Sequence, residues 1–96
     1  MARVRDVERQ IRKLEGFRVA FLYPDGRDVR GDKMQIPGYT RRYARMAFNS
    51  MSVTDWIESR FRPHYPGYDV RVLKADGQRA HGNYKLGTVR DTYLDA

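Results

Sequence analysis

A segment of seventeen residues occurs twice in this chain, and no other feature of the sequence constrains the fold as much. Aligned without a gap, residues 16–32 and 67–83 share six identities, whereas chance at average residue usage gives about one. The shared residues are a glycine near each end, a Val, a Leu and a central Asp-Gly pair: Gly16, Val19, Leu22, Asp25, Gly26 and Gly31 align with Gly67, Val70, Leu73, Asp76, Gly77 and Gly82. A general likeness among hairpins explains the Asp-Gly pair but explains the flanking glycines less well, which favours a true internal repeat.

An amphipathic helix is predicted before each copy. Apolar residues recur at spacings of three and four from Val4 to Leu14, which is the pattern of a helix with one buried face. Gly16 follows as a typical helix-ending residue. Ser52 lies three residues before Asp55, the spacing of an N-cap with an acidic residue in the first turn, and predicts a second helix over 53–61.

Within each copy the sequence has the pattern of a β-hairpin. Apolar and polar residues alternate over 17–22 and over 68–73, which predicts a strand in both places. The Asp-Gly pair then reverses the chain, because glycine accepts the positive φ of a tight turn. We expect the chain to return as a partner strand over 27–31 and over 79–89.

The predicted fold class is α+β, with two helix–β-hairpin repeats (αββ-α-αββ) sharing a four-stranded antiparallel sheet with helices on one face. A lone two-stranded hairpin is marginally stable in water, so the hairpins are expected to join edge to edge. The 96 residues suffice for a single domain, 1–96, in which a bridging helix over 39–50 connects the repeats 3–32 and 52–83. The predicted core consists of apolar residues on the inward faces of these elements: Val7, Ile11, Leu14, Phe17, Val19, Phe21, Trp56, Phe61, Val70 and Val72.

The charge of the chain points to an anionic partner. Its net charge is +7, and 15 of its 19 basic residues are arginines. Guanidinium groups bind phosphates in a bidentate way, so the first hypothesis is a small basic, non-enzymatic nucleic-acid-binding module that contacts the backbone of DNA or RNA. The alternative explanation of the arginine excess is a GC-rich genome, which enriches arginine codons without any binding role.

The predicted binding residues lie on the bridging helix and on the polar face of the sheet. Arginines that alternate with tyrosines can hold phosphates and stack on bases, and the bridging helix brings such residues together. The candidate nucleic-acid-binding residues are Arg41, Arg42, Arg45, Tyr39, Arg18 and Arg71. The competing interpretation is a solvated helix face whose tyrosines belong to the core.

The first helix carries four basic residues that we expect to be neutralised locally. Arg5, Arg9, Arg12 and Lys13 lie on its outer faces, and Asp6, Glu8 and Glu15 are within helical reach of them. Ion pairs along one helix are weak but common. This helix is therefore predicted to be an ordinary surface helix.

A second hypothesis assigns the chain to another class of function. A protein–protein interaction module or small inhibitor could dock on an acidic partner protein through the polar face or an edge of the sheet. A homodimer formed through such an edge belongs to the same hypothesis. An enzyme ranks third, because no set of catalytic residues is recognisable in the sequence.

The sequence excludes several kinds of chemistry. The chain has no cysteine, which removes thiol catalysis and zinc–thiolate sites. Its two histidines, His64 and His81, lack further ligands at metal-binding spacing, so we predict no catalytic residues, no metal and no cofactor. No apolar run approaches the roughly 20 residues of a membrane span, and the first residues lack a signal-peptide pattern. The expected location is cytoplasmic, with no membrane partner.

Overall fold

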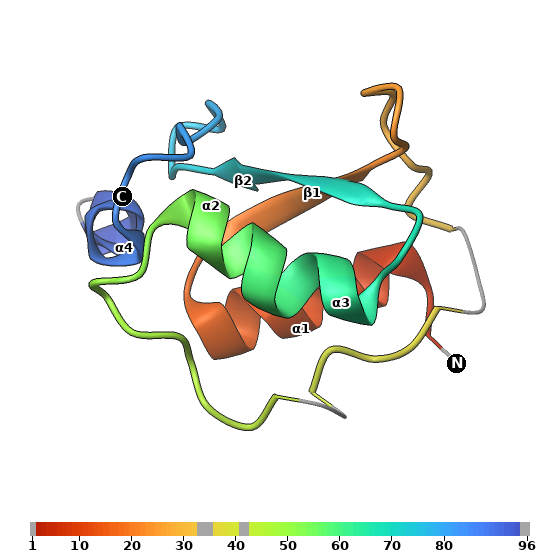
Figure 1. Cartoon of the computed structure of the whole chain (residues 1–96), viewed down its shortest axis with the longest axis horizontal. Helices are drawn as coiled ribbons and strands as arrows, with labels where there is room; N and C mark the ends of the chain where they lie inside the picture. The colour runs from red at the N-terminus through yellow and green to blue at the C-terminus, as the bar shows by residue number, and fades with distance from the viewer. Residues whose placement is uncertain (1, 33–35, 41–42, 95–96) are drawn as a thin grey trace.

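The computed structural model describes residues 2–32, 36–40 and 43–94, and it places helices against one face of a two-stranded antiparallel sheet (Figure 1). In chain order the elements are α1 (Val4–Glu15), β1 (Arg18–Leu22), α2 (Val53–Trp56), the π-helix η1 (Ile57–Phe61), α3 (Arg62–His64), β2 (Asp69–Leu73) and α4 (Leu86–Leu94). Because α2, η1 and α3 follow one another without a break, we call them together the second helical body. None of the helices within the described ranges combines the length and the apolar character needed to cross a bilayer.

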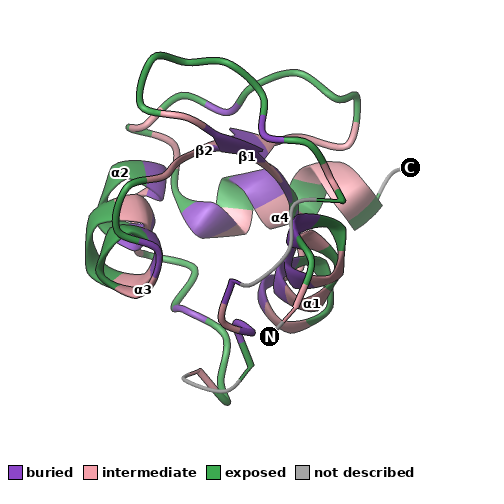
Figure 2. Ribbon diagram, turned by 90° about the vertical axis from the view of Figure 1, so that its right-hand side faces the viewer, coloured by how far each residue is buried: buried purple, intermediate pink, exposed green. Residues whose placement is uncertain are grey.

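The core lies between the sheet and the helices. Figure 2 shows α1 and the second helical body side by side beneath the strands, with buried residues facing the space between them. In the sheet, Val19 faces Val72 and Phe21 faces Val70, and all four side chains are buried. The predicted core residues are confirmed as buried, except that Leu14 is only partly buried.

Both predicted helix ends are confirmed. Gly16 has a φ of +85° and ends α1, and its N–H donates to the carbonyl of Arg12 at 3.0 Å. A side chain at this position would be strained, because the left-handed region disfavours residues with a Cβ. The hydroxyl of Ser52 accepts a hydrogen bond from the N–H of Asp55 at 3.1 Å and thereby caps the start of α2.

The prediction of a four-stranded sheet shared by two helix–hairpin repeats is wrong. After each turn the returning chain makes one isolated bridge, Leu22 to Asp28 and Leu73 to Arg79, and forms no further strand. The backbone then leaves the sheet. In each segment the carbonyl of the next glycine accepts a hydrogen bond from an N–H in the first turn of α1 or of α2. These bonds run from Arg5 N to Gly31 O and from Thr54 N to Gly82 O, both 2.9 Å long. The free amides of the helix ends compete with the sheet for these carbonyls.

The two turns have the same backbone hydrogen bonds. In each turn, the N–H of the residue after the strand donates to the carbonyl of the residue after the glycine. The glycine N–H donates to the carbonyl of the residue after the strand, and one later N–H donates to a carbonyl of the strand. The first turn has Tyr23 N to Arg27 O, Gly26 N to Tyr23 O and Val29 N to Phe21 O; the second has Lys74 N to Gln78 O, Gly77 N to Lys74 O and Ala80 N to Val72 O. The two turn segments therefore resemble each other in backbone hydrogen bonding as well as in sequence.

The predicted bridging helix over 39–50 is also wrong, because none of its described residues lies in a helix. We call the described residues 39–40 and 43–51 the connector. Its amides bind side chains from α1 instead of its own carbonyls: Tyr39 N donates to Gln10 Oε1 and Ala47 N to Glu15 Oε1, both at 2.8 Å. Among the described residues of the connector, one bond has the i→i−4 spacing of an α-helix, from Tyr43 N to Tyr39 O at 3.2 Å. Side-chain oxygens of α1 thus take the place of the backbone carbonyls that would accept from these amides in a helix.

A helix replaces the strand that we expected over 79–89. Residues 86–94 form α4, and Leu86 and Val89 are buried on its inner side. Its first amides find acceptors far away in the sequence, since Leu86 N donates to Met51 O at 2.8 Å and Gly87 N to Asn49 O at 3.1 Å. Gly82 and Gly87 already weaken the strand prediction, because glycine in a strand interior is unfavourable.

Candidate nucleic-acid interface

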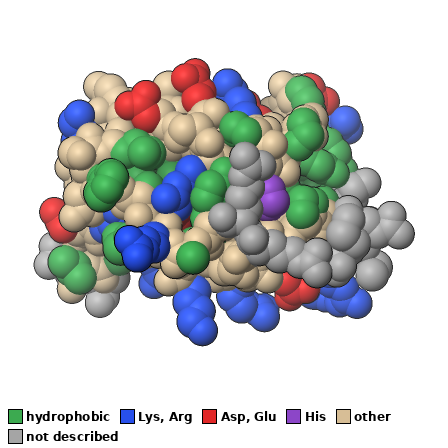
Figure 3. Space-filling view, turned by 60° about the horizontal axis from the view of Figure 1, so that its bottom comes forward, with side chains coloured by type: hydrophobic (Ala, Val, Ile, Leu, Met, Phe, Trp, Pro, Cys, Tyr) green, Lys and Arg blue, Asp and Glu red, His purple; other side chains and the backbone are tan. Residues whose placement is uncertain are grey.

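Four basic side chains lie on the outer face of α1. Because Val4, Val7 and Ile11 face the core, the helical period places the residues between them on the surface. The exposed residues that we call the α1 basic face are Arg5, Arg9, Arg12 and Lys13. Their spacings of four, three and one keep them within about one third of the helix circumference. In Figure 3, Lys and Arg side chains stand along the lower edge of the view, where α1 runs.

The expected neutralisation of these charges within α1 is largely wrong. Of the three acids, only Asp6 pairs with this face, and its contact with Arg9 is long at 3.9 Å. Glu8 accepts instead from the backbone N–H of Phe21 at 3.0 Å, and burial raises the pKa of its carboxyl. Glu15 is turned into the core. The positive charge of α1 is thus left mostly open to a partner.

Arg18 extends the positive surface past the end of α1. The ring of Tyr93, on α4, has the Arg12 guanidinium 4.4 Å and the Arg18 guanidinium 6.0 Å from its centre. The tyrosine itself is fixed, because its hydroxyl accepts from Arg18 N at 2.9 Å and donates to the carbonyl of Leu73. A guanidinium on a fixed ring loses less freedom when it binds a phosphate.

A shallow hollow of about 280 Å³ lies beside these side chains. It is lined by residues of α1 and by the start of β1 and the end of β2: Glu8, Arg9, Arg12, Arg18, Val19 and Leu73. The surface of the hollow is mainly apolar, and the three arginines that border it bring positive charge to its rim. Its single carboxyl, Glu8, is already engaged with the Phe21 amide.

The predicted site on the connector is not assembled by the structure as we expected. Arg41 and Arg42 lie outside the described residues. Arg45 is exposed, and its carbonyl accepts from Arg60 Nη1 at 2.6 Å. Tyr39 is fully buried and its hydroxyl donates to Glu15, so its ring has no open face for a base. We expected the bridging helix to bring these arginines and tyrosines together, but the described residues do not form that helix.

The polar face of the sheet carries the other two candidates. Arg18 is exposed, and its side chain also donates to Ala75 O at 3.0 Å. Arg71 is half-buried and lies 3.9 Å from the carboxylate of Asp28. On the same face, Asp69 is 3.5 Å from Arg62. Charges of both signs therefore alternate on this face, in contrast to α1.

A buried carboxylate links the elements that surround the core. Glu15 is completely buried, and five donors from the connector, the second helical body and α4 reach its two oxygens. The donors are Tyr39 Oη at 2.5 Å, Ala47 N at 2.8 Å, Trp56 Nε1 at 3.2 Å, Arg60 Nη1 at 2.8 Å and Arg90 Nη2 at 3.2 Å. We call Glu15 with the side chains of Tyr39, Trp56, Arg60 and Arg90 the Glu15 cluster. With its acceptor capacity occupied, this carboxylate is a structural link and is poorly suited to act as a base.

Burial shifts the ionisation of the groups around Glu15. It raises the pKa of the Tyr39 hydroxyl far above the usual range, and the hydrogen bond to the Glu15 carboxylate raises it further. Burial lowers the pKa of Arg90. It opposes the charge of Arg60 as well, but there the bonding to Tyr39 and the charge of Glu15 outweigh burial and raise the pKa. Near neutral pH the Tyr39 phenol is therefore neutral and both guanidiniums keep their charge.

The contacts of α1 with Tyr93 and the burial of Glu15 were not predicted from the sequence. One available signal was the spacing from Val4 through Val7 and Ile11 to Glu15, which continues the buried stripe by another turn. An acid on such a stripe predicts a buried ion pair. No comparable signal identifies Arg60, Arg90 or Tyr93, because their roles depend on elements whose positions the local pattern does not predict.

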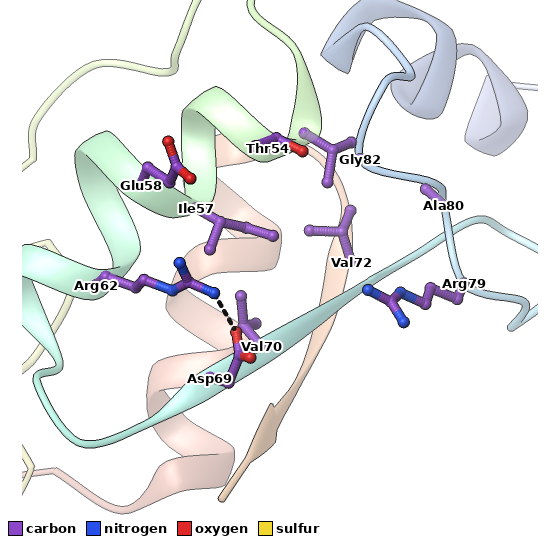
Figure 4. A pocket seen from close by; sticks show the side chains of 11 residues that line it. Thr54, Ile57, Glu58, Arg62, Asp69, Val70, Val72, Arg79, Ala80 and Gly82 are labelled. Atoms are coloured by element: carbon purple, nitrogen blue, oxygen red, sulfur yellow. Dashed lines mark hydrogen bonds and ion pairs between the residues drawn. The ribbon is translucent and has the colours of Figure 1, made fainter. Parts of the chain in front are cut away.

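A second hollow lies between the second helical body and β2, with a volume of about 140 Å³ (Figure 4). Its floor is apolar, with Val53, Ile57, Val70 and Val72, and Figure 4 shows the dashed contact between Arg62 and Asp69 at its side. The space corresponds to a few water molecules. No group of three His, Asp or Glu side chains able to hold a metal occurs in the described part of the chain.

Comparisons with known protein families, with curated proteins and with solved structures found no match to this chain.

Proposed function

We propose that this protein is a small, non-enzymatic nucleic-acid-binding module that contacts phosphates through the α1 basic face and Arg18. The observation that carries the proposal is that two of the three acids of α1 turn away from its basic residues, because Glu8 binds a strand amide and Glu15 is buried; Asp6 makes only a long contact with Arg9. A positive helix face without matching acids attracts a polyanion.

The dimensions of the α1 basic face suit a phosphate backbone. From Arg5 to Lys13 the helix rises about 12 Å. Duplex DNA carries one negative charge per about 1.7 Å of its axis, so several phosphates lie within reach of these side chains. The Arg12 guanidinium covers the ring of Tyr93, which leaves that ring unsuited to stack on a base. We therefore expect binding that depends on backbone charge and only weakly on sequence.

The test is binding of labelled duplex DNA and of labelled RNA by fluorescence anisotropy over a salt series. The test variant replaces Arg9, Arg12 and Lys13 with Gln. The control variant removes the same charge by replacing Arg27, Arg30 and Arg62, each of which has an aspartate within 3.5 Å, with Gln. Circular dichroism and thermal melting show whether both variants are folded.

We expect log affinity of the native chain to fall linearly with log salt. Each phosphate contact contributes about 0.7–0.9 to that slope, so the test variant should flatten it by about two to three units if each residue meets a phosphate. The control variant should change the slope by less than one unit. Absence of binding at low salt contradicts the proposal. Equal competition by polyglutamate would point to an acidic protein partner instead.

A further inference from the structure

The connector presents two large apolar side chains to water. Phe48 is 79% exposed and Met46 is 48% exposed. In the face that Figure 3 shows, hydrophobic side chains lie at the surface where the connector crosses the molecule. Exposed aromatic and Met side chains are typical of surfaces that bind other proteins.

The backbone beneath these side chains is firmly held. Ala47, which lies between them, donates its N–H to buried Glu15 at 2.8 Å. The carbonyl of Arg45 accepts from Arg60 at 2.6 Å, and the side-chain oxygen of Asn49 accepts from Arg90 at 2.7 Å. The exposure of Phe48 is thus a property of a fixed backbone, so ordering this segment costs a partner little entropy.

An acidic groove adjoins Phe48. This groove has a volume of about 520 Å³, and Phe48, Ser50, Met51, Asp55, Glu58 and Ser59 line it. No Lys or Arg belongs to the lining. Across the described residues, neither Asp55 nor Glu58 forms an ion pair within 4.0 Å. In a chain of net charge +7, an apolar groove with two carboxylates that form no ion pair has the opposite charge from the α1 basic face.

We propose that this groove, together with Phe48 and Met46, is the docking site for a basic amphipathic segment of another protein. An apolar side chain of the partner packs between Phe48 and Met51, and its flanking Lys or Arg side chains pair with Asp55 and Glu58. Opposite charges around an apolar centre give both affinity and orientation. The same carboxylates repel a phosphate backbone, so this site is distinct from the α1 basic face.

A separate partner fits these observations better than a second copy of this chain. The basic surface that would complement the groove is on α1, whereas the groove is on the connector and the second helical body. A contact between two different patches is heterologous, and it grows into open chains unless its rotation closes a ring. A separate partner protein can occupy the groove without the chains growing into an open assembly.

The experiment uses a defined probe, a synthetic helical peptide of alternating Leu and Lys blocks. A Leu–Glu peptide of the same length is its charge control. Because the chain itself carries +7, general electrostatics disfavour the cationic peptide, and binding requires a local acidic site. Calorimetry measures affinity, and amide chemical shifts in NMR spectra locate the contact.

Two substitutions with matched controls identify the groove. Phe48→Ser removes the exposed ring, and Leu94→Ser removes an apolar side chain that is 80% exposed on α4. Glu58→Gln removes a carboxylate of the groove, and Asp91→Asn removes an exposed carboxylate of α4. We expect Phe48→Ser to weaken peptide binding at least tenfold and Glu58→Gln to reduce its salt dependence, with no change in either control.

Several results would overturn this inference. They are failure of the native chain to bind the Leu–Lys peptide, equal binding of the Leu–Glu peptide, and equal losses in Leu94→Ser and Phe48→Ser. Self-association in sedimentation that Phe48→Ser abolishes would assign the surface to a second copy. Nucleic-acid binding should be unchanged by Phe48→Ser, so failure here leaves the proposed function of the α1 basic face unaffected.

Discussion

The segments 16–31 and 67–82 have the same turn hydrogen bonds, but the residues directly before them differ in a decisive way. Glu15 precedes the first segment and is a buried charged link, whereas Pro66 precedes the second and is exposed. Next to Pro66 it is Tyr65 that is buried, and its hydroxyl donates a hydrogen bond to Pro37 O at 2.9 Å. Similar local sequence therefore accompanies similar turns, while the cores behind the turns are built from different chemistry.

This difference has a physical reason. A turn depends on residues that are neighbours in the chain, and each copy supplies the same Asp and Gly for it. The Glu15 cluster depends on donors from the connector, the second helical body and α4, which no repeat supplies twice. The comparison predicts that stability depends strongly on Glu15 and weakly on its counterpart.

The largest effect is expected from Glu15→Ala. Removing the carboxylate leaves two largely buried guanidiniums, whose side chains are 20% and 11% exposed, without their partner. Breaking a buried pair in this way costs about 3–5 kcal/mol of unfolding free energy. Pro66→Ala, at the aligned position, should cost less than about 1 kcal/mol in the same urea titration. Equal losses at both positions would remove the distinction between the halves.

If Glu15→Ala does not fold, Arg90→Met provides the same test in milder form. The apolar Met side chain fills part of the space of Arg90 and leaves the pair between Glu15 and Arg60 in place. The variant should fold and be less stable than the native chain. A stable Arg90→Met protein with unchanged unfolding free energy would contradict the structural role of the cluster.

A smaller effect is expected from Trp56→Phe. The substitution keeps an aromatic ring against Phe17, whose centre lies 5.1 Å away, but it removes the indole N–H that donates to Glu15 at 3.2 Å. A hydrogen bond to a charged group contributes about 1.5–3 kcal/mol, and the unfolding free energy should fall by at least that amount, because the smaller ring also loses buried contacts. In Glu15→Gln the same substitution should cost less, and equal costs in both backgrounds would contradict a direct bond.

Two aligned glycines should respond differently to Ala. A Cβ at Gly82 would lie 2.2 Å from the hydroxyl of Thr54, whereas at Gly31 it would lie 3.4 Å from the Cβ of Arg5. Gly82→Ala should therefore cost about 1–3 kcal/mol and Gly31→Ala less than about 1 kcal/mol. Adding Thr54→Ala should recover part of the loss at Gly82 and nothing at Gly31. Similar losses at both glycines would mean that the two segments are closer in packing than the structure indicates.

The smallest effect concerns pH and Glu8. Burial raises the pKa of Glu8 above its ordinary value of 4.5, so the folded chain retains the proton to higher pH than the unfolded chain. Its contribution to stability is present below the ordinary pKa and is lost as pH rises through the raised value. Glu8→Gln keeps an acceptor for the Phe21 amide and should gain stability relative to the native chain as pH rises toward neutrality. A difference that stays constant with pH would contradict this assignment.

The sequence by itself determined the parts of the molecule that depend on near neighbours. The period of α1, the glycine that ends it, the Ser52 cap, the alternation in β1 and β2 and most of the core follow from local spacing and are confirmed. These features share one reason: the hydrogen bonds and apolar contacts involved repeat every two to four residues along the chain.

Tertiary structure alone decided the connector, α4, the sheet and the surface of the candidate interface. The connector is not helical because Gln10 and Glu15 accept its amides, and α4 begins where Asn49 and Met51 offer carbonyls. The sheet stops at two strands because Gly31 and Gly82 turn to the helix amides, and α1 stays positive because Glu15 is drawn into the core. In each case a buried polar group takes the partner that desolvation makes most favourable, and that partner is distant in the sequence.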